Sequence, residues 1–268
     1  MNVSKCEKQM NCKSSKSNQT SRFCKTILLA SLLISSIANA IIIRHDVSDE
    51  KYIALSEPFV SMVKMNLPDG VGTLISKEWV LTAAHVAQLV NKGHTVDVNG
   101  KQFTVEKVMI HPENREDPGV DIALIKLTQP VNHVKPVNLY TNTDELGKKI
   151  IIVGHSKSGN GLTGGTKIDG KSRAAQNTID NIYKNKWISF KFNHPSDINV
   201  DAMEGVPDAG DNGGAAYFVD GDKQYILGVS SAQSTKGTNG KEGRYGVTEY
   251  FMRVSYYSEW IYQTVTSN

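Results

Sequence analysis

Three short stretches of this 268-residue chain carry side chains that together could do acyl-transfer chemistry. His85 closes the run Thr82-Ala83-Ala84-His85, and Asp121 opens an apolar run. The stretch Gly210-Asp211-Asn212-Gly213-Gly214 is a glycine-rich turn of a kind that gathers backbone N–H groups. Hydrolysis of an amide by this route needs a base, a carboxylate that orients it, donors aimed at an oxyanion and a nucleophile. The nucleophile is missing, because asparagine stands at the centre of the turn.

Each stretch also has a simpler structural interpretation. A histidine at a strand end is usually packed, an aspartate before a strand usually caps it, and Gly and Asn are common in hairpin turns. These interpretations leave the order of the stretches unexplained. They also leave unexplained two later runs, Leu227-Gly228-Val229-Ser230-Ser231 and the segment from Arg253 to Ile261.

With these five stretches in this order, residues 41–268 resemble the chymotrypsin/trypsin-like serine peptidases. The resemblance implies an all-β fold, in which two six-stranded antiparallel β-barrels pack together and a C-terminal helix follows. It implies serine-type endopeptidase activity for the family. Animal members usually carry several disulfides, and all three cysteines here lie within the first 40 residues. The resemblance therefore points to a bacterial, secreted member.

The resemblance also implies a role for each matching residue. His85 would be the general base and Asp121 the group that orients it. Asn212 occupies the position of the nucleophile, and the N–H groups of Gly210 and Asn212 would form the oxyanion hole. Asp211 would form a buried ion pair with a free amine on Ile41.

Substrate specificity is weakly marked. Val206, six residues before Asn212, falls where the family has the base of its main specificity pocket, so the acid that selects Arg or Lys is absent from that position. Ser231 and Gln233 would edge the substrate cleft, with Gln233 in the place of a pocket-lining glycine. No cofactor is implied, and no Cys/His group has zinc-ligand spacing.

Three functions remain open for such a chain. The first is a pseudoprotease that binds peptides or proteins through its cleft. The second is a hydrolase that uses another nucleophile or a water-assisted route. The third is an ordinary serine endopeptidase whose recorded sequence carries a serine-to-asparagine change.

The first 40 residues differ in composition from the remainder. Six basic residues and one acid precede the apolar run Ile27–Ile34, and the small residues Ala38-Asn39-Ala40 follow. This pattern predicts a secretory signal peptide over residues 1–40, with an uncleaved membrane anchor as the alternative. Residues 41–268 would then be a secreted or periplasmic peptidase domain with 24 basic and 26 acidic residues. This near-neutral balance argues against nucleic acid as a partner.

The remaining sequence indicates short strands separated by turn residues. The expected strands are 59–65, 72–75, 79–82, 103–110, 122–127, 150–153, 187–192, 215–219 and 225–230. Val254, Tyr257, Ile261 and Val265 have helical spacing and predict a C-terminal amphipathic helix. The Gly- and Ser-rich segment 156–175 predicts a long surface loop.

Overall fold

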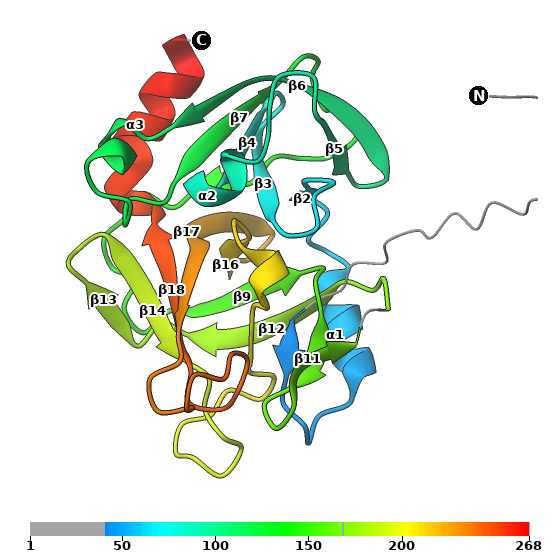
Figure 1. Ribbon diagram of the computed structural model, residues 1–268, viewed down its shortest axis with the longest axis vertical. Helices are drawn as coiled ribbons and strands as arrows, with labels where there is room; N and C mark the ends of the chain where they lie inside the picture. The colour runs from blue at the N-terminus through cyan, green and yellow to red at the C-terminus, as the bar shows by residue number, and fades with distance from the viewer. Residues whose placement is uncertain (1–40, 168, 268) are drawn as a thin grey trace, which may run out of the picture. The chain divides into compact units, whose positions relative to one another are not determined.

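The computed structural model describes residues 41–167 and 169–267. The predicted signal peptide, residues 1–40, lies outside the described residues. The predicted fold class is confirmed, because the described chain is mostly β structure with a C-terminal helix (Figure 1). Within the described residues, no helix has the length and apolar character needed to cross a membrane.

The first lobe is a closed barrel of antiparallel strands, in the order β2-β3-β4-β7-β6-β5. Its strands are β2 (Met62–Lys64), β3 (Val71–Ser76), β4 (Trp79–Thr82), β5 (Thr95–Val98), β6 (Lys101–Ile110) and β7 (Ala123–Leu127). Two short helices lie in its connections, α2 (Ala84–Ala87) and the 3-10 helix η1 (Pro112–Arg115). Because the barrel is closed, every strand of this lobe has a hydrogen-bonded neighbour on both sides.

The second lobe is an open, curled sheet and not the closed six-stranded barrel that the sequence predicted. Its order is β12-β9-β16-β17-β18-β14-β13, and β8 pairs with β17 in parallel. The strands are β8 (Asn138–Leu139), β9 (Lys149–Gly154), β12 (Arg173–Thr178), β13 (Asn181–Tyr183), β14 (Trp187–Lys191), β16 (Ala215–Asp220), β17 (Lys223–Ser234) and β18 (Thr248–Arg253). The outer edge of β12 is covered by loop backbone, where the N–H of Gln176 donates to the Met203 carbonyl at 2.8 Å.

A separate four-stranded sheet corrects the prediction of a long loop over 156–175. Its order is β11-β10-β1-β15, with β1 (Ile42–Ile43), β10 (Ser158–Asn160), β11 (Gly164–Lys167) and β15 (Gly205–Val206). Ile42 pairs with Gly159 on one side and Val206 on the other. The segment becomes a strand because a distant partner satisfies its backbone, which local composition does not reveal.

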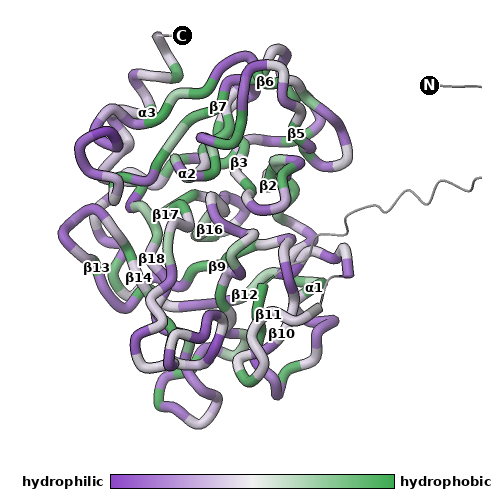
Figure 2. The backbone as a smooth tube through the Cα atoms, viewed as in Figure 1, coloured by the Kyte–Doolittle hydropathy of each residue, from purple (hydrophilic) through white to green (hydrophobic). Residues whose placement is uncertain are grey.

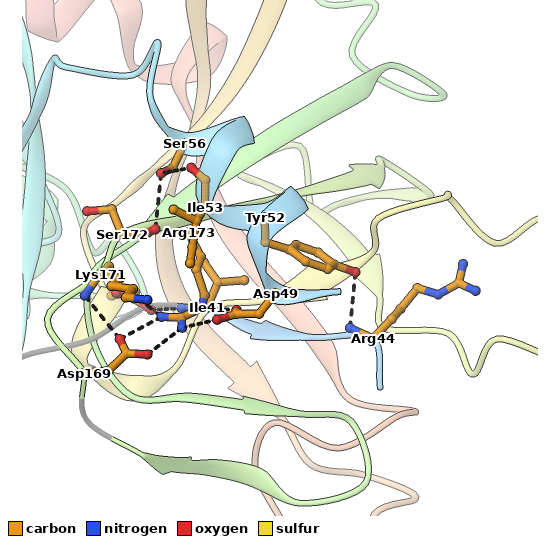
Figure 3. A network of polar contacts seen from close by, with 11 residues as sticks. Ile41, Arg44, Asp49, Tyr52, Ile53, Ser56, Asp169, Lys171, Ser172 and Arg173 are labelled. Carbon is orange, nitrogen blue, oxygen red and sulfur yellow. Dashed lines mark hydrogen bonds and ion pairs between the residues drawn. The ribbon is translucent and has the colours of Figure 1, made fainter. Parts of the chain in front are cut away.

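Helix α1 (Asp49–Ser56), which the sequence analysis did not predict, is joined to β12 by a buried cation. The Arg173 side chain is 2% exposed and donates to both carboxylate oxygens of Asp49 and of Asp169, at 2.5–3.0 Å. Figure 3 shows the guanidinium between the two carboxylates, beside α1. Two carboxylates around one guanidinium offset the penalty of burying the charge.

Apolar side chains fill the interior of both lobes, and the hydrophobic stretches follow the strands in Figure 2. One core cluster contains residues from both lobes, among them Phe59 and Leu74 of the first and Tyr217 and Val229 of the second. Helix α3 (Val254–Ser267) buries Val254, Tyr257, Ile261 and Thr264, close to the predicted stripe.

Candidate active site

His85 lies in α2, immediately after the barrel strand β4. The small residues Ala83 and Ala84 are fully buried and allow the chain to turn sharply from the strand into the helix. The backbone N–H of His85 donates to Oδ1 of Asp121 at 2.8 Å, and its ring Nδ1 lies 2.7 Å from Oδ2 of the same carboxylate. The structure therefore brings His85 and Asp121 together through two contacts.

The two side chains of this pair differ in exposure. The His85 side chain is 43% exposed and the Asp121 side chain only 9%. Burial by itself raises the pKa of Asp121, but hydrogen bonds from His85 and Ser231 outweigh it and hold that pKa below its ordinary value. A charged, buried carboxylate behind an accessible imidazole suits a base that must be oriented, and then stabilised when protonated.

Ser231 contributes to the pair in a way that sequence reasoning missed. Its hydroxyl donates to Oδ2 of Asp121 at 2.7 Å. The sequence predicts that Ser231 edges the substrate cleft, which stays a prediction, and the structure adds its contact with the Asp121 carboxylate. The sequence did not predict this contact, because it depends on a β-bulge between Ser230 and Ala232 that shifts the register of β17 against β18.

The glycine-rich turn packs against the strand end that carries His85. Gly213 has φ +83°, and a Cβ added there would lie 2.3 Å from both Thr82 Oγ1 and the Val71 carbonyl oxygen. The N–H of Val71 donates to the Asn212 carbonyl at 2.9 Å, and the N–H of Gly213 donates to Ser230. Only glycine permits this approach, so the turn is fixed beside the first lobe.

The residues before Gly213 form the 3-10 helix η2 (Ala209–Asp211). Its first hydrogen bond runs from the N–H of Asp211 to the Asp208 carbonyl at 2.8 Å. Gly210 is buried within η2, and Asn212 follows directly. It stays a prediction that the N–H groups of Gly210 and Asn212 form the oxyanion hole.

Asp211 is fully enclosed beneath the turn. Its carboxylate accepts from the backbone N–H groups of His155 at 2.6 Å and Ser156 at 2.8 Å, and from the backbone nitrogen of Ile41 at 3.3 Å. Burial raises the pKa of Asp211 to about 6, although hydrogen bonds from the His155 N–H, the Ser156 hydroxyl and the Asp208 N–H oppose the rise. The first described residue, Ile41, is thus already held against the carboxylate that the sequence assigned to it.

A cavity of about 80 Å³ opens beside Asn212. Its wall consists of Pro207, Asp208, Ala209, Asn212, Ala232, Gln233, Glu242, Gly243 and Glu249. Gln233 lines this cavity, and its role in substrate binding stays a prediction. Val206 is fully buried in β15, and the next residue, Pro207, reaches the wall.

Glu249 is the lining residue that sequence reasoning missed. It lies on β18 directly opposite Gln233 of β17, and the Gln233 amide donates to its carboxylate. Burial raises the pKa of Glu249 to about 8, and the Gln233 hydrogen bond only partly opposes this rise. A Gln and a Glu sixteen positions apart gave no motif, and only the strand pairing shows that they meet.

Comparison with known proteins agrees with this geometry. A chymotrypsin-like elastase family member 1 from Macaca fascicularis is 28% identical over 220 residues, which is 74% of this chain and 79% of that protein. Trypsin-4 of Rattus norvegicus is 29% identical over 228 residues, covering 76% of this chain and 85% of the relative. Complement C1s subcomponent of Sus scrofa is 30% identical over 245 residues, 79% of this chain but only 34% of that longer protein.

The family model named Trypsin matches residues 50–261. This range contains the barrel, the curled sheet, the His85–Asp121 pair and the glycine-rich turn. The chain therefore belongs to the trypsin-like serine protease family.

Proposed function

We propose that this chain is a secreted pseudoprotease, which keeps the peptide-binding cleft of its family and lacks the nucleophile. The observation that carries the proposal is the hydrogen-bonded group of His85, Asp121 and Ser231, retained in a fold whose glycine-rich turn presents Asn212. Its ligand would be a peptide or a segment of another protein.

The chemistry of Asn212 supports loss of hydrolysis. The nitrogen of a carboxamide is delocalised into its carbonyl and is not nucleophilic at neutral pH. Removal of a proton by His85 therefore yields no species that forms an acyl-enzyme. In subtilisin, a different serine protease, loss of the nucleophilic serine lowers turnover by about a millionfold.

A second candidate is favoured by the same retained group. A serine endopeptidase whose recorded sequence carries a serine-to-asparagine change would also show His85 and Asp121 in hydrogen-bonding geometry. Resequencing the codon for residue 212 separates this candidate from the first. For a hydrolase with a non-standard nucleophile, the described residues 41–167 and 169–267 show no supporting contact.

The decisive experiment is to restore the hydroxyl. We expect Asn212→Ser to hydrolyse casein or a mixed peptide library and to react with a fluorophosphonate, because base and orienting carboxylate lie within hydrogen-bond reach of each other. The unmodified protein should do neither. The double variant Asn212→Ser with His85→Ala is the control and should be inactive. Turnover by the unmodified protein that His85→Ala abolishes would contradict the proposal.

Maturation after Ala40 is part of the proposal. The Ala38-Asn39-Ala40 ending suits signal peptidase, and cleavage there would place a free amine 3.3 Å from Asp211. We therefore expect mass spectrometry of the exported protein to find Ile41 at its N-terminus. A start more than one residue away would exclude this ion pair.

A further inference from the structure

The chain contains four Asn-Gly pairs, which begin at Asn99, Asn160, Asn212 and Asn239. In such a pair the backbone nitrogen of the glycine can attack the side-chain carboxamide, because a glycine puts no side chain in the way. The nitrogen gives up its proton to a base and bonds to Cγ, the Cγ–Nδ2 bond breaks, and ammonia leaves. Water then opens the resulting succinimide ring to aspartate or isoaspartate. No enzyme is needed, so the surroundings of each pair decide whether it reacts.

Two of the pairs are held by packing and by hydrogen bonds. Gly161 is buried, and its N–H donates to the carbonyl of Ile43 at 3.0 Å. Gly213 is buried beside Asn212, and its N–H donates to the carbonyl of Ser230 at 2.8 Å. In both pairs the nitrogen that would attack is already bonded, and it reaches the asparagine side chain only if the local structure opens.

The other two pairs lie in exposed turns of the same conformation. Asn99 and Gly100 have φ +47° and +81°, and Asn239 and Gly240 have φ +53° and +74°. Positive φ at both central residues is typical of a type I′ turn, for which Asn-Gly is the preferred sequence. A Cβ added to either glycine would meet nothing within 4 Å. Exposure and backbone shape therefore do not distinguish these two pairs.

A hydrogen bond to the glycine nitrogen does distinguish them. The N–H of Gly100 donates to Oδ1 of Asp97 at 3.0 Å. In the part of the chain that the structure describes, no acceptor lies in hydrogen-bonding position for the N–H of Gly240. The residue that corresponds to Asp97 in this turn is Gly237, which has no side chain to offer. The nitrogen of Gly240 is therefore free to attack, whereas that of Gly100 must first give up its bond.

We propose that Asn239 is a site of spontaneous deamidation in the folded protein, with water as the co-reactant, and that the fold protects the other three Asn-Gly pairs. Deamidation at Asn239 is independent of the proposed function, since it requires neither the cleft nor a ligand. The product carries one more negative charge than the encoded chain, because a carboxylate replaces a neutral amide.

The modification would change the loop between β17 and β18. Isoaspartate lengthens the backbone within the turn, so the hydrogen bond from the Lys241 N–H to the Thr238 carbonyl, now 3.2 Å long, should be lost. The same loop carries Glu242 and Gly243, which line the cavity beside Asn212. The age of the protein would therefore be written into one wall of that cavity.

The test follows all four pairs by peptide mapping and mass spectrometry under mildly alkaline conditions, which favour loss of the glycine N–H proton. In the folded protein Asn239 should convert at least about fivefold faster than Asn99, because a hydrogen bond of ordinary strength must break before Gly100 can attack. Asn160 and Asn212 should convert more slowly still. In urea, which unfolds the chain, all four should convert at similar rates.

Two results would overturn the inference. The first is a folded protein in which any of the other three pairs converts as fast as Asn239. The second is a chain in urea in which Asn239 still reacts alone, since local sequence and not the fold would then select it. Both measurements use the unmodified protein and depend on no variant.

Asp97→Ala tests the role of the hydrogen bond directly. Removal of the acceptor should raise the rate at Asn99 toward that at Asn239, whose own rate should stay the same. Lys101→Ala, an exposed change beside the same turn, is the matched control and should leave Asn99 protected. An Asn99 rate that does not rise in Asp97→Ala would show that the glycine N–H bond is not what selects between the two turns.

Discussion

At the scale of single residues, the candidate site joins a hydrogen-bonded pair, His85 and Asp121, to a turn that carries Asn212. The backbone of Asn212 helps to hold the turn in place, since its carbonyl accepts from the N–H of Val71. The neighbouring hydrogen bonds from His85 and Ser231 to Asp121 are all formed. Under the proposed function, the side chain of Asn212 alone prevents acyl transfer, and the backbone contacts of the turn hold the rest of the site in place.

Glu249 should make the protein less stable as the pH rises. Its folded pKa of about 8 lies above its ordinary value of 4.5, so the folded state binds the proton more tightly than the unfolded chain. Its contribution is fully present below pH 4.5 and is lost as pH rises through 8, by up to about 1.4 kcal/mol per pH unit. Urea unfolding at pH 5 and pH 8 measures the loss.

Glu249→Gln should remove most of this pH dependence, since an amide does not titrate in that range. Glu116→Gln is the matched control and should preserve it. Asp211, whose pKa is raised to about 6, contributes a smaller loss between its ordinary value of 3.8 and 6, and this loss is the same in all three proteins. An unchanged difference between pH 5 and pH 8 in Glu249→Gln would contradict the assignment.

At the scale of elements, the fit of the glycine-rich turn against β4 can be tested by adding one methyl group. Gly213→Ala should destabilise the protein by more than about 2 kcal/mol, because the new Cβ meets Thr82 Oγ1 and the Val71 carbonyl. Gly221→Ala is the matched control, with φ +57° and open space around its Cβ, and should cost only about 1 kcal/mol. Equal losses in chemical denaturation would show that the turn does not pack as described.

The ion pairs by which Arg173 of β12 holds α1 give a second prediction at the scale of elements. Arg173→Met should cost about 2 kcal/mol and raise hydrogen exchange across α1, because it removes the buried guanidinium that donates to Asp169 and to the partly exposed Asp49. Lys171→Met, an exposed change in the same loop, should have little effect. Unchanged exchange at Tyr52 in the Arg173 variant would mean that apolar packing alone holds the helix.

The elements that the sequence revealed are those whose signal is local. Trp79–Thr82 is a short apolar run that follows a turn, and it forms β4 as predicted. The stripe of Val254, Tyr257 and Ile261 forms one face of α3. Segment 156–175 was misread because its strands depend on Ile42, more than a hundred residues away. Helix α1 lacks an apolar stripe, and the buried Arg173 that holds it is distant in sequence.

The residues of the candidate site likewise fall into those with a local sequence signal and those without one. His85 and Asp121 were found because short motifs surround them. Glu249 and the hydroxyl of Ser231 were not found, because strand register and a β-bulge bring them to the site. Residues placed by pairing between distant strands carry no pattern that a reading along the chain can detect.

At the scale of the whole domain, stability rests on a core that the two lobes share. Phe59, just before β2, packs against Tyr217 of β16 with ring centroids 4.8 Å apart and ring planes tilted by 50°. The Tyr217 hydroxyl lies 3.3 Å from Ser61 Oγ. Both residues belong to a cluster that also includes Leu74, Val229 and Tyr257. A lobe that unfolded alone would expose its half of this apolar surface to water.

We therefore expect residues 41–268 to unfold in one cooperative transition, with tryptophan fluorescence and far-ultraviolet circular dichroism giving the same midpoint in urea. Dithiothreitol should leave that midpoint unchanged, because these residues contain no cysteine and their cohesion comes from packing. Phe59→Ala removes the ring at the lobe boundary and should lower the midpoint for both probes together, by the equivalent of about 3 kcal/mol. Two midpoints that separate in the unmodified protein would show that the lobes are independent, and the shared core would then be a contact surface and not a single folding unit.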